Sequence, residues 1–261
     1  MPEDADCLLI NAPMSDISEA ERDTILEYLQ AGGKLILITG PLQDGTELTN
    51  LEAVMEYYGV TAADGIVVEG SDSNYLFPAP INLLPEYGSH EITSPLSEGG
   101  YYMCLPLAQG LVVGDAPRDT VSVTELLTTS DSAYSKLSGY SMSTYEKEDG
   151  DIDGPFALAV AITETLSDGG ETGVIWVSSA YLLDGSTNAS ISGGNEDFFL
   201  NCVNWLCGSE SGISIHAKSL DAEYLTISSG TSSLLTMLMV GVIPVCFLAA
   251  GIVIWVRRKK R

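Results

Sequence analysis

The stretch DCLLINAPMSDISEAERDTILEYLQAGGKLILITGP, residues 6–41, decides the fold class. Its first apolar run, 6–10, is continuous, as in a strand that is buried on both faces. A helix predicted over 19–31 follows and ends at Gly32-Gly33, and the apolar run 34–39 forms the next strand. Strand, helix and strand in this order predict a βαβ unit with two parallel strands and a right-handed crossover.

The start of this helix carries a capping box. The Ser18 hydroxyl is placed to accept a hydrogen bond from the third helical N–H, while Glu21 reaches back to the cap. Ile25, Leu26 and Leu29 share one helical face, which we expect to pack on the core.

The rest of the chain continues with strands and helices between long insertions. Apolar spacing predicts helices over 50–58 and over 196–207, the second capped by Gly193-Gly194-Asn195. Pro-rich and polar composition predicts surface insertions over 71–100 and 129–154. Further strands are predicted over 65–69, 101–113, 121–128, 156–162 and 173–178, and an extended stretch over 213–227. The pattern favours an α/β fold, a flavodoxin-like or class I amidotransferase-like parallel sheet with long insertions.

A C-terminal segment is long and apolar enough to cross a membrane. LLTMLMVGVIPVCFLAAGIVIWV, residues 234–256, has 23 residues without a charge, about 34 Å of helix. Trp255 is an interfacial aromatic, and Pro244 is expected to kink the helix. The sequence predicts an extracytoplasmic domain over 1–228, a linker over 229–233, a transmembrane helix over 234–256 and a basic cytoplasmic tail over 257–261.

Charge around this segment predicts its orientation. The tail RRKKR, 257–261, follows the apolar run directly. Basic residues stay preferentially in the cytoplasm, so we expect the plasma membrane as the location, with the large domain outside. Residues 1–13 contain neither a basic n-region nor a long apolar run. We therefore expect an upstream segment with the first membrane signal to precede this sequence; the alternative is a domain that faces the cytosol, with the basic end of the helix translocated.

The large domain is strongly acidic. Before the basic tail the chain has six Lys and Arg against 36 Asp and Glu, a formal charge of −30. Such a surface repels phosphate backbones, which excludes nucleic acid as a partner. Solubility or a saline or extracytoplasmic medium explains the acidity, and a surface that binds divalent cations is the alternative.

The cysteines form no metal-binding or redox motif. No CxxC pair is present, and Cys202 and Cys207 fall on one predicted helix, where their Cα atoms are too far apart for a disulfide. All five, namely Cys7, Cys104, Cys202, Cys207 and Cys246, are predicted to be buried thiols.

Motifs for catalysis and nucleotide binding are missing from the sequence. It has only His90 and His216 as histidine bases, and no GxSxG, GxxxxGK[ST] or GxGxxG motif. The acidic run 146–153 lacks the register of a calcium loop and is predicted to be a solvated loop. In an open α/β sheet a ligand would lie at the strand ends, here 11–13, 39–41 and 178–180, which hold little reactive chemistry. We therefore assign no catalytic residue, cofactor or metal.

Eight stretches in succession resemble one family, the auxiliary membrane-anchored components of ABC-type transport systems in the gliding-motility-associated group. They are INAPMSDISEAERDTILEYLQAGGKLILITGP, LEAVMEYYGV, SHEITSPL, LLTTSDSAY, DGPFALAVAI, GVIWVSSAYLL, GNEDFFLNCVNWLCG and IPVCFLAAGIVIWVRRKKR. The resemblance covers nearly the whole chain. It implies a non-enzymatic accessory subunit beside separate permease and ATPase subunits in the lipid bilayer. It also implies an additional N-terminal membrane helix and an earlier half-domain upstream of this sequence.

Two other functions stay open from the residues. A surface receptor for glycans or polymers would use the tyrosines 75, 87, 101 and 102. An anchored hydrolase would depend on Ser178 or Ser179.

Overall fold

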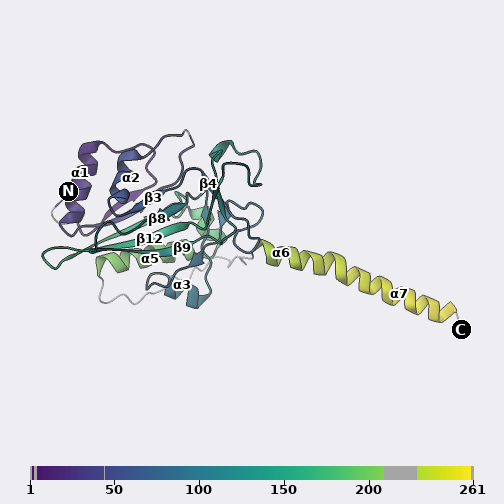
Figure 1. Ribbon diagram of the computed structural model, residues 1–261. Helices are drawn as coiled ribbons and strands as arrows, with labels where there is room; N and C mark the ends of the chain where they lie inside the picture. The colour runs from purple at the N-terminus through teal and green to yellow at the C-terminus, as the bar shows by residue number, and fades with distance from the viewer. Residues whose placement is uncertain (1, 3–4, 44, 209–227, 260–261) are drawn as a thin grey trace.

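The computed structural model describes residues 2, 5–43, 45–208 and 228–259 (Figure 1). Its strands are β1 Leu8–Asn11, β2 Lys34–Ile38, β3 Val60–Ala62, β4 Ile66–Val68, β5 Asn82–Leu83, β6 Glu86–Tyr87, β7 Leu105–Pro106, β8 Leu111–Val113, β9 Val121–Thr128, β10 Tyr134–Lys136, β11 Ile152–Asp153, β12 Ala157–Thr165 and β13 Glu171–Val177. Its helices are α1 Glu19–Gln30, α2 Thr49–Glu56, α3 Ser94–Gly99, α4 Gly185–Ser190, α5 Gly194–Cys207, α6 Ser229–Thr236 and α7 Ile243–Lys259, with a 3₁₀ turn η1 Gly139–Ser141 and a π segment η2 Met237–Val242.

The predicted βαβ unit is present. β1 and β2 pair in parallel with Leu8 opposite Leu35, and α1 connects them. The capping box at the start of α1 is formed, because the Ser18 hydroxyl accepts from Glu21 N–H and the Glu21 carboxylate accepts from Ser18 N–H. Gly32 follows the helix with φ of 92°, the left-handed conformation expected of a glycine stop.

The central sheet is mixed, whereas a parallel, flavodoxin-like sheet was predicted. Only β1, β2 and β13 run parallel; β12 pairs antiparallel with β13, β9 and β8. The cause is local: a tight turn with a hydrogen bond from Leu166 N–H to the Gly170 carbonyl joins β12 to β13. A short connection of this kind can only join antiparallel strands. The α/β class and the parallel pairing of β1 with β2 were predicted correctly; the antiparallel pairing of β12 with its neighbours was not.

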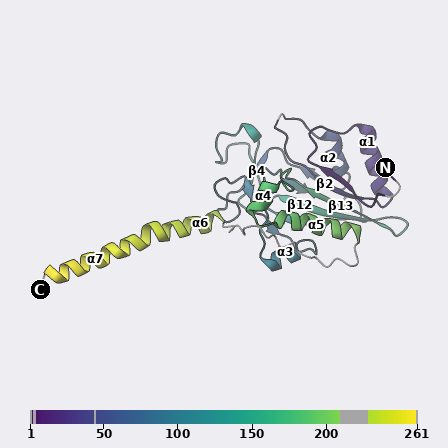
Figure 2. The same ribbon diagram turned by 180° about the vertical axis from the view of Figure 1, so that it is seen from behind.

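Helices cover both faces of this sheet. Figures 1 and 2 show α1 and α2 on one face and α5 on the other. Successive residues of β2 therefore alternate between two cores: Leu35 and Leu37 pack with the side chains of α1 and α2, and Ile36 and Ile38 pack with those of α5. Both sides of β2 are shielded from water, which explains its continuous apolar run.

Small sheets form in the predicted insertions. β4 pairs antiparallel with β10, and β10 with β11. β5 pairs with β7, and β6 joins the central sheet beside β9. Residues 101–113, predicted as one strand, instead contain the short strands β7 and β8, which are separated by Leu107 at a φ of 49°. The helix α4, between β13 and α5, was not predicted.

The C-terminal apolar segment forms a helix that extends away from the domain (Figure 1). Within the described residues, Gly230–Lys259 is the one helix long and apolar enough to cross a membrane, with 30 residues and a mean hydropathy of 2.7. Residues 229–233, expected as a linker, are helical and belong to α6. Pro244 has no N–H for the Val240 carbonyl, and the helix widens into the π segment over 237–242 just before it.

Candidate functional site

The strand ends that were expected to face a ligand are closed by backbone packing. The ends of β2 and β13 touch at Gly40, where an added Cβ would lie 3.0 Å from the Ala180 nitrogen. Beneath this contact the Trp176 Nε1–H donates to the Thr39 hydroxyl over 2.8 Å. Both side chains are buried, so the ends of β2 and β13 pack against each other and leave no open crevice between them.

The two serines at this edge are structural. Ser178 Oγ donates to the Leu158 carbonyl over 3.0 Å, and Ser179 Oγ donates to the Pro106 carbonyl over 2.6 Å. Both residues are fully buried. A nucleophilic serine needs a base that accepts its proton, and here the protons are shared with backbone carbonyls.

The described histidine does not supply that base. The His90 ring stacks edge-on against Trp205 with 5.3 Å between centroids, and its Nδ1 accepts from Ile92 N–H. Burial lowers the pKa of His90. His216 lies outside the described residues.

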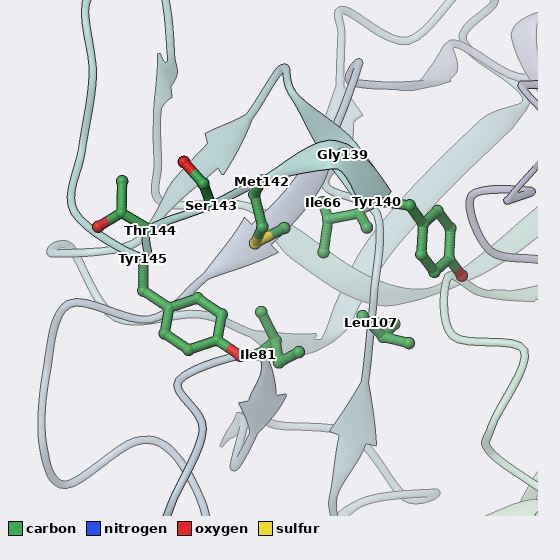
Figure 3. Close-up of a pocket in the computed structure, with 9 residues that line it drawn as sticks. All are labelled: Ile66, Ile81, Leu107, Gly139, Tyr140, Met142, Ser143, Thr144 and Tyr145. Atoms are coloured by element: carbon green, nitrogen blue, oxygen red, sulfur yellow. The ribbon is translucent and has the colours of Figure 1, made fainter.

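A pocket of about 310 Å³ lies beside this closed edge, under the insertion that contains η1. Figure 3 shows Tyr140 and Tyr145 at two sides of it, with Met142 and Ile66 between them. Its lining is mostly apolar and comprises Ile66, Ile81, Leu107, Gly139, Tyr140, Met142, Ser143, Thr144 and Tyr145. Sequence reasoning missed this site, because these residues come from four separate parts of the chain: β4, the two insertions, and the link between β7 and β8.

Hydrogen bonds hold this insertion over the pocket. Tyr140 Oη donates to the Pro41 carbonyl over 3.1 Å, which joins the insertion to the end of β2. Tyr134 Oη donates to the Tyr145 carbonyl, and Ser135 Oγ donates to the Asp64 carbonyl over 2.6 Å. Tyr140 and Tyr145 still expose 38% and 41% of their surface, so both rings are accessible to a partner.

A buried lysine organises the acidic segment 146–153. The Lys136 side chain is fully withdrawn from solvent, and its Nζ lies 2.6 Å from the Glu146 carbonyl, 2.8 Å from the Glu148 carboxylate and 3.4 Å from the Asp151 carboxylate. The hydrogen bond to Glu148 is the main reason that the pKa of Lys136 is raised. The segment is an exposed loop, as predicted, and the buried ammonium of Lys136 holds its inner side.

A buried carboxylate fixes the strand end next to the pocket. Glu69, directly after β4, accepts hydrogen bonds from Ser71 N–H, Ser130 N–H and Ser130 Oγ, the last over 2.5 Å. This carboxylate joins 69–71 to the segment after β9, so the two insertions that flank the pocket are connected at their bases.

The C-terminal apolar helix, the candidate membrane anchor, starts at the same end of the domain. Gly230 N–H donates to the Asp72 carbonyl over 2.8 Å, and Ser228 forms a β-bridge with Leu76. Figures 1 and 2 both place β4, a pocket strand, at the end from which α6 leaves. The pocket therefore lies on the anchor-proximal end of the domain.

The structure groups three of the four tyrosines considered for glycan binding. Tyr87 Oη donates to the Tyr101 carbonyl over 2.9 Å, and Tyr102 exposes 46% of its surface beside them. Tyr75 instead donates to the Asp72 carboxylate at the root of the anchor. In the described residues no group of three or more His, Cys, Asp or Glu side chains is arranged to hold a metal ion.

Comparison with known proteins shows the family. The family model described as "ABC-type uncharacterized transport system" (ABC_transp_aux) matches residues 1–202. The chain belongs to this family. The ABC_transp_aux name describes an auxiliary component of an ABC-type transport system, and the apolar C-terminal helix fits a membrane location.

One solved structure shares the fold. The mmIFT52 N-terminal domain is 16% identical, with a TM-score of 0.54, and the match covers 78% of this chain and 77% of that chain. At this identity the likeness concerns the fold alone. A search among curated proteins finds no match.

Proposed function

We propose that this ABC_transp_aux chain is a non-enzymatic, membrane-anchored accessory subunit of an ABC-type transport complex. Its domain lies outside the cell, its basic tail lies in the cytoplasm, and its partners are the permease and ATPase subunits, as in the gliding-motility-associated group. The family match carries the proposal.

The position of the pocket supports a role in binding the permease. The pocket shares the 66–87 segment with the contacts that hold the start of α6. A helix that crosses the bilayer keeps this end of the domain close to the membrane surface, where extracytoplasmic loops of a permease would lie. Exposed aromatic side chains over an apolar pocket are the composition typical of the centre of a protein interface.

The chemistry of the strand ends supports a non-enzymatic role. The hydroxyls of Ser178 and Ser179 are buried and donate to backbone carbonyls. An anchored hydrolase would need one of these hydroxyls as a nucleophile, but here both form hydrogen bonds that hold the strand ends together.

Co-purification tests the partnership. We expect the tagged chain, extracted in mild detergent, to retain a permease and an ATPase, and the double variant Tyr140→Ala/Tyr145→Ala to lose most of both. Leu200→Ala, which changes an exposed side chain on α5 outside the pocket, is the matched control and should retain them. Recovery of wild-type chain without either subunit would refute the proposal.

Protease added to intact cells tests the orientation. The proposal predicts that the large domain is degraded and that an epitope after Arg261 is protected until the cells are lysed. Protection of the domain in intact cells would contradict an extracytoplasmic location.

A further inference from the structure

Cys7 and Cys207 are 200 positions apart in the sequence but lie at the same corner of the fold. The strand pairing locates Cys7. Cys7 directly precedes β1, whose Leu8 pairs with Leu35 of β2, so Cys7 lies beside Lys34. Lys34 in turn pairs with Gly173, near the start of β13. Cys7 is therefore two strands away from Gly173, at the end of the sheet opposite the pocket.

Helix α5 ends over this same corner. At Gly173 an added Cβ would lie 2.7 Å from Leu206 Cδ2 and 3.6 Å from the Trp205 ring, and Cys207 follows directly. Cys7 packs against the buried cluster that contains Leu206. Cys207 therefore lies near Cys7, and its side chain is one of the groups that raise the pKa of the Cys7 thiol, after burial.

We propose that Cys7 and Cys207 are a redox-active pair that closes to a disulfide between β1 and the C-terminal end of α5. The oxidant is a disulfide, either a low-molecular-weight one or that of a thiol–disulfide oxidoreductase. The two thiols each give up a proton and together two electrons; one S–S bond forms in the protein, and the oxidant's S–S bond is reduced to two thiols. The prediction that all five cysteines are buried thiols is wrong, because Cys207 is exposed and Cys7 is only half-buried.

The two cysteines differ in solvent exposure, and this difference gives them different roles in the reaction. Cys207 is exposed, so an external disulfide reaches it first. Cys7 is half-buried; its burial, followed by the neighbouring Cys207, raises its pKa to about 11. Cys7 is therefore the resolving thiol, which attacks the mixed disulfide on Cys207. Cys104 and Cys202 are buried, and Cys246 lies in the anchor helix.

The cross-link would join the first strand to the last helix before residues 209–227. β1 is paired only along its β2 edge among the described strands. A covalent bond to α5 would hold this edge strand in place.

Peptide mapping of the full-length chain in detergent tests the pair. After incubation with oxidised glutathione and alkylation of the remaining thiols, cleavage with chymotrypsin after Trp205 separates Cys202 from Cys207. We expect a linked Cys7–Cys207 peptide to form at least about tenfold faster than any product of Cys104 or Cys202, because thiol access sets the rate. Alkylation of both Cys7 and Cys207 after oxidation, or a link from Cys207 to Cys202, would overturn the proposal.

Two matched measurements exclude a chance product. The closing step should speed up about tenfold per pH unit between roughly pH 7 and 9, because the thiolate fraction of Cys7 grows in that proportion below its pKa.

Reduction should lower the Tm of the oxidised wild type and of Cys246→Ser by about 5–10 °C. It should leave Cys7→Ser/Cys207→Ser unchanged. An equal effect of reduction on the double serine variant would contradict the proposed bond.

Discussion

The Tyr140 hydroxyl lies 3.1 Å from the Pro41 carbonyl and donates a hydrogen bond to it. Tyr140 belongs to η1 in the insertion over the pocket, and Pro41 follows β2 in the central sheet. This bond connects a surface loop to the end of a buried strand of the central sheet. It therefore fixes how the aromatic side chains around the pocket are presented.

Removing that hydroxyl tests its positioning role. Tyr140→Phe keeps the ring but leaves the Pro41 carbonyl without this donor, so we expect a loss of about 0.5–1 kcal/mol in the free energy of unfolding. Because the insertion is also held by other bonds, the variant should fold and retain part of the co-purified permease. Denaturant unfolding and co-purification measure the two effects; an unchanged unfolding curve would show that the bond does not contribute.

The ion pairs of Lys136 lead to a prediction about the stability of the acidic segment 146–153. Lys136→Met removes the ammonium from the Glu148 and Asp151 carboxylates, and these repel each other once the cation is lost. We expect faster proteolysis within 137–151 and a Tm lower by about 5–10 °C. Lys147→Met is the control, because its partner Asp153 is exposed and surface ion pairs contribute little. Equal effects of the two changes would contradict the structural role of Lys136.

The hydrogen bonds of the Asp16 carboxylate lead us to expect that the stability of the fold depends on pH. Its carboxylate accepts from Asn50 N–H over 2.8 Å and from Leu51 N–H over 3.2 Å, and so caps α2. Burial acts to raise its pKa, but these hydrogen bonds outweigh it and the pKa is lowered from the ordinary 3.8. The charge therefore stabilises the fold above pH 3.8, and this contribution is lost as pH falls through the lowered pKa.

We expect Asp16→Ala to cost about 1–2 kcal/mol at neutral pH, the usual value of a helix cap. The difference from wild type should shrink below pH 3.8. Asp16→Asn keeps an acceptor without the charge, so its cost should be smaller. Urea unfolding across this pH range measures both; a cost that stays constant at acidic pH would exclude the carboxylate as the cap.

Ser178 and Ser179 allow a direct test of the hydrolase alternative. Ser179→Ala removes a donor to the Pro106 carbonyl and should cost about 1 kcal/mol of stability. Hydrolysis of a chromogenic ester by the wild type should stay at the buffer rate, and the variant should match it. Ester hydrolysis above that rate in the wild type, abolished by Ser179→Ala, would restore the hydrolase alternative.

The sequence was informative where a pattern is local. The capping box at Ser18 and Glu21, the left-handed Gly32 and the apolar run of β2 are each complete within a few residues. The strands 121–128 and 156–162 were also located correctly, because their β-branched content needs no knowledge of their partners.

Sequence reasoning failed where distant segments meet. Strand direction depended on the turn at 166–170, and the pocket depended on four distant parts of the chain folding together. Gly193 lies in the stretch expected to cap α5 and takes the cap position, but the pairing of the buried Asn195 amide with both backbone groups of Cys104 was not predicted. None of these contacts leaves a periodic trace in the chain.

Photo-crosslinking in intact cells measures the central proposal most directly. A photoreactive phenylalanine analogue at position 145, on the rim of the anchor-proximal pocket, should form a covalent product with the permease subunit of an ABC-type transporter. The same analogue at position 200 on α5 should not. A product at 145 that contains no transporter subunit, or equal permease products from both positions, would contradict the account of an accessory subunit that binds through this end.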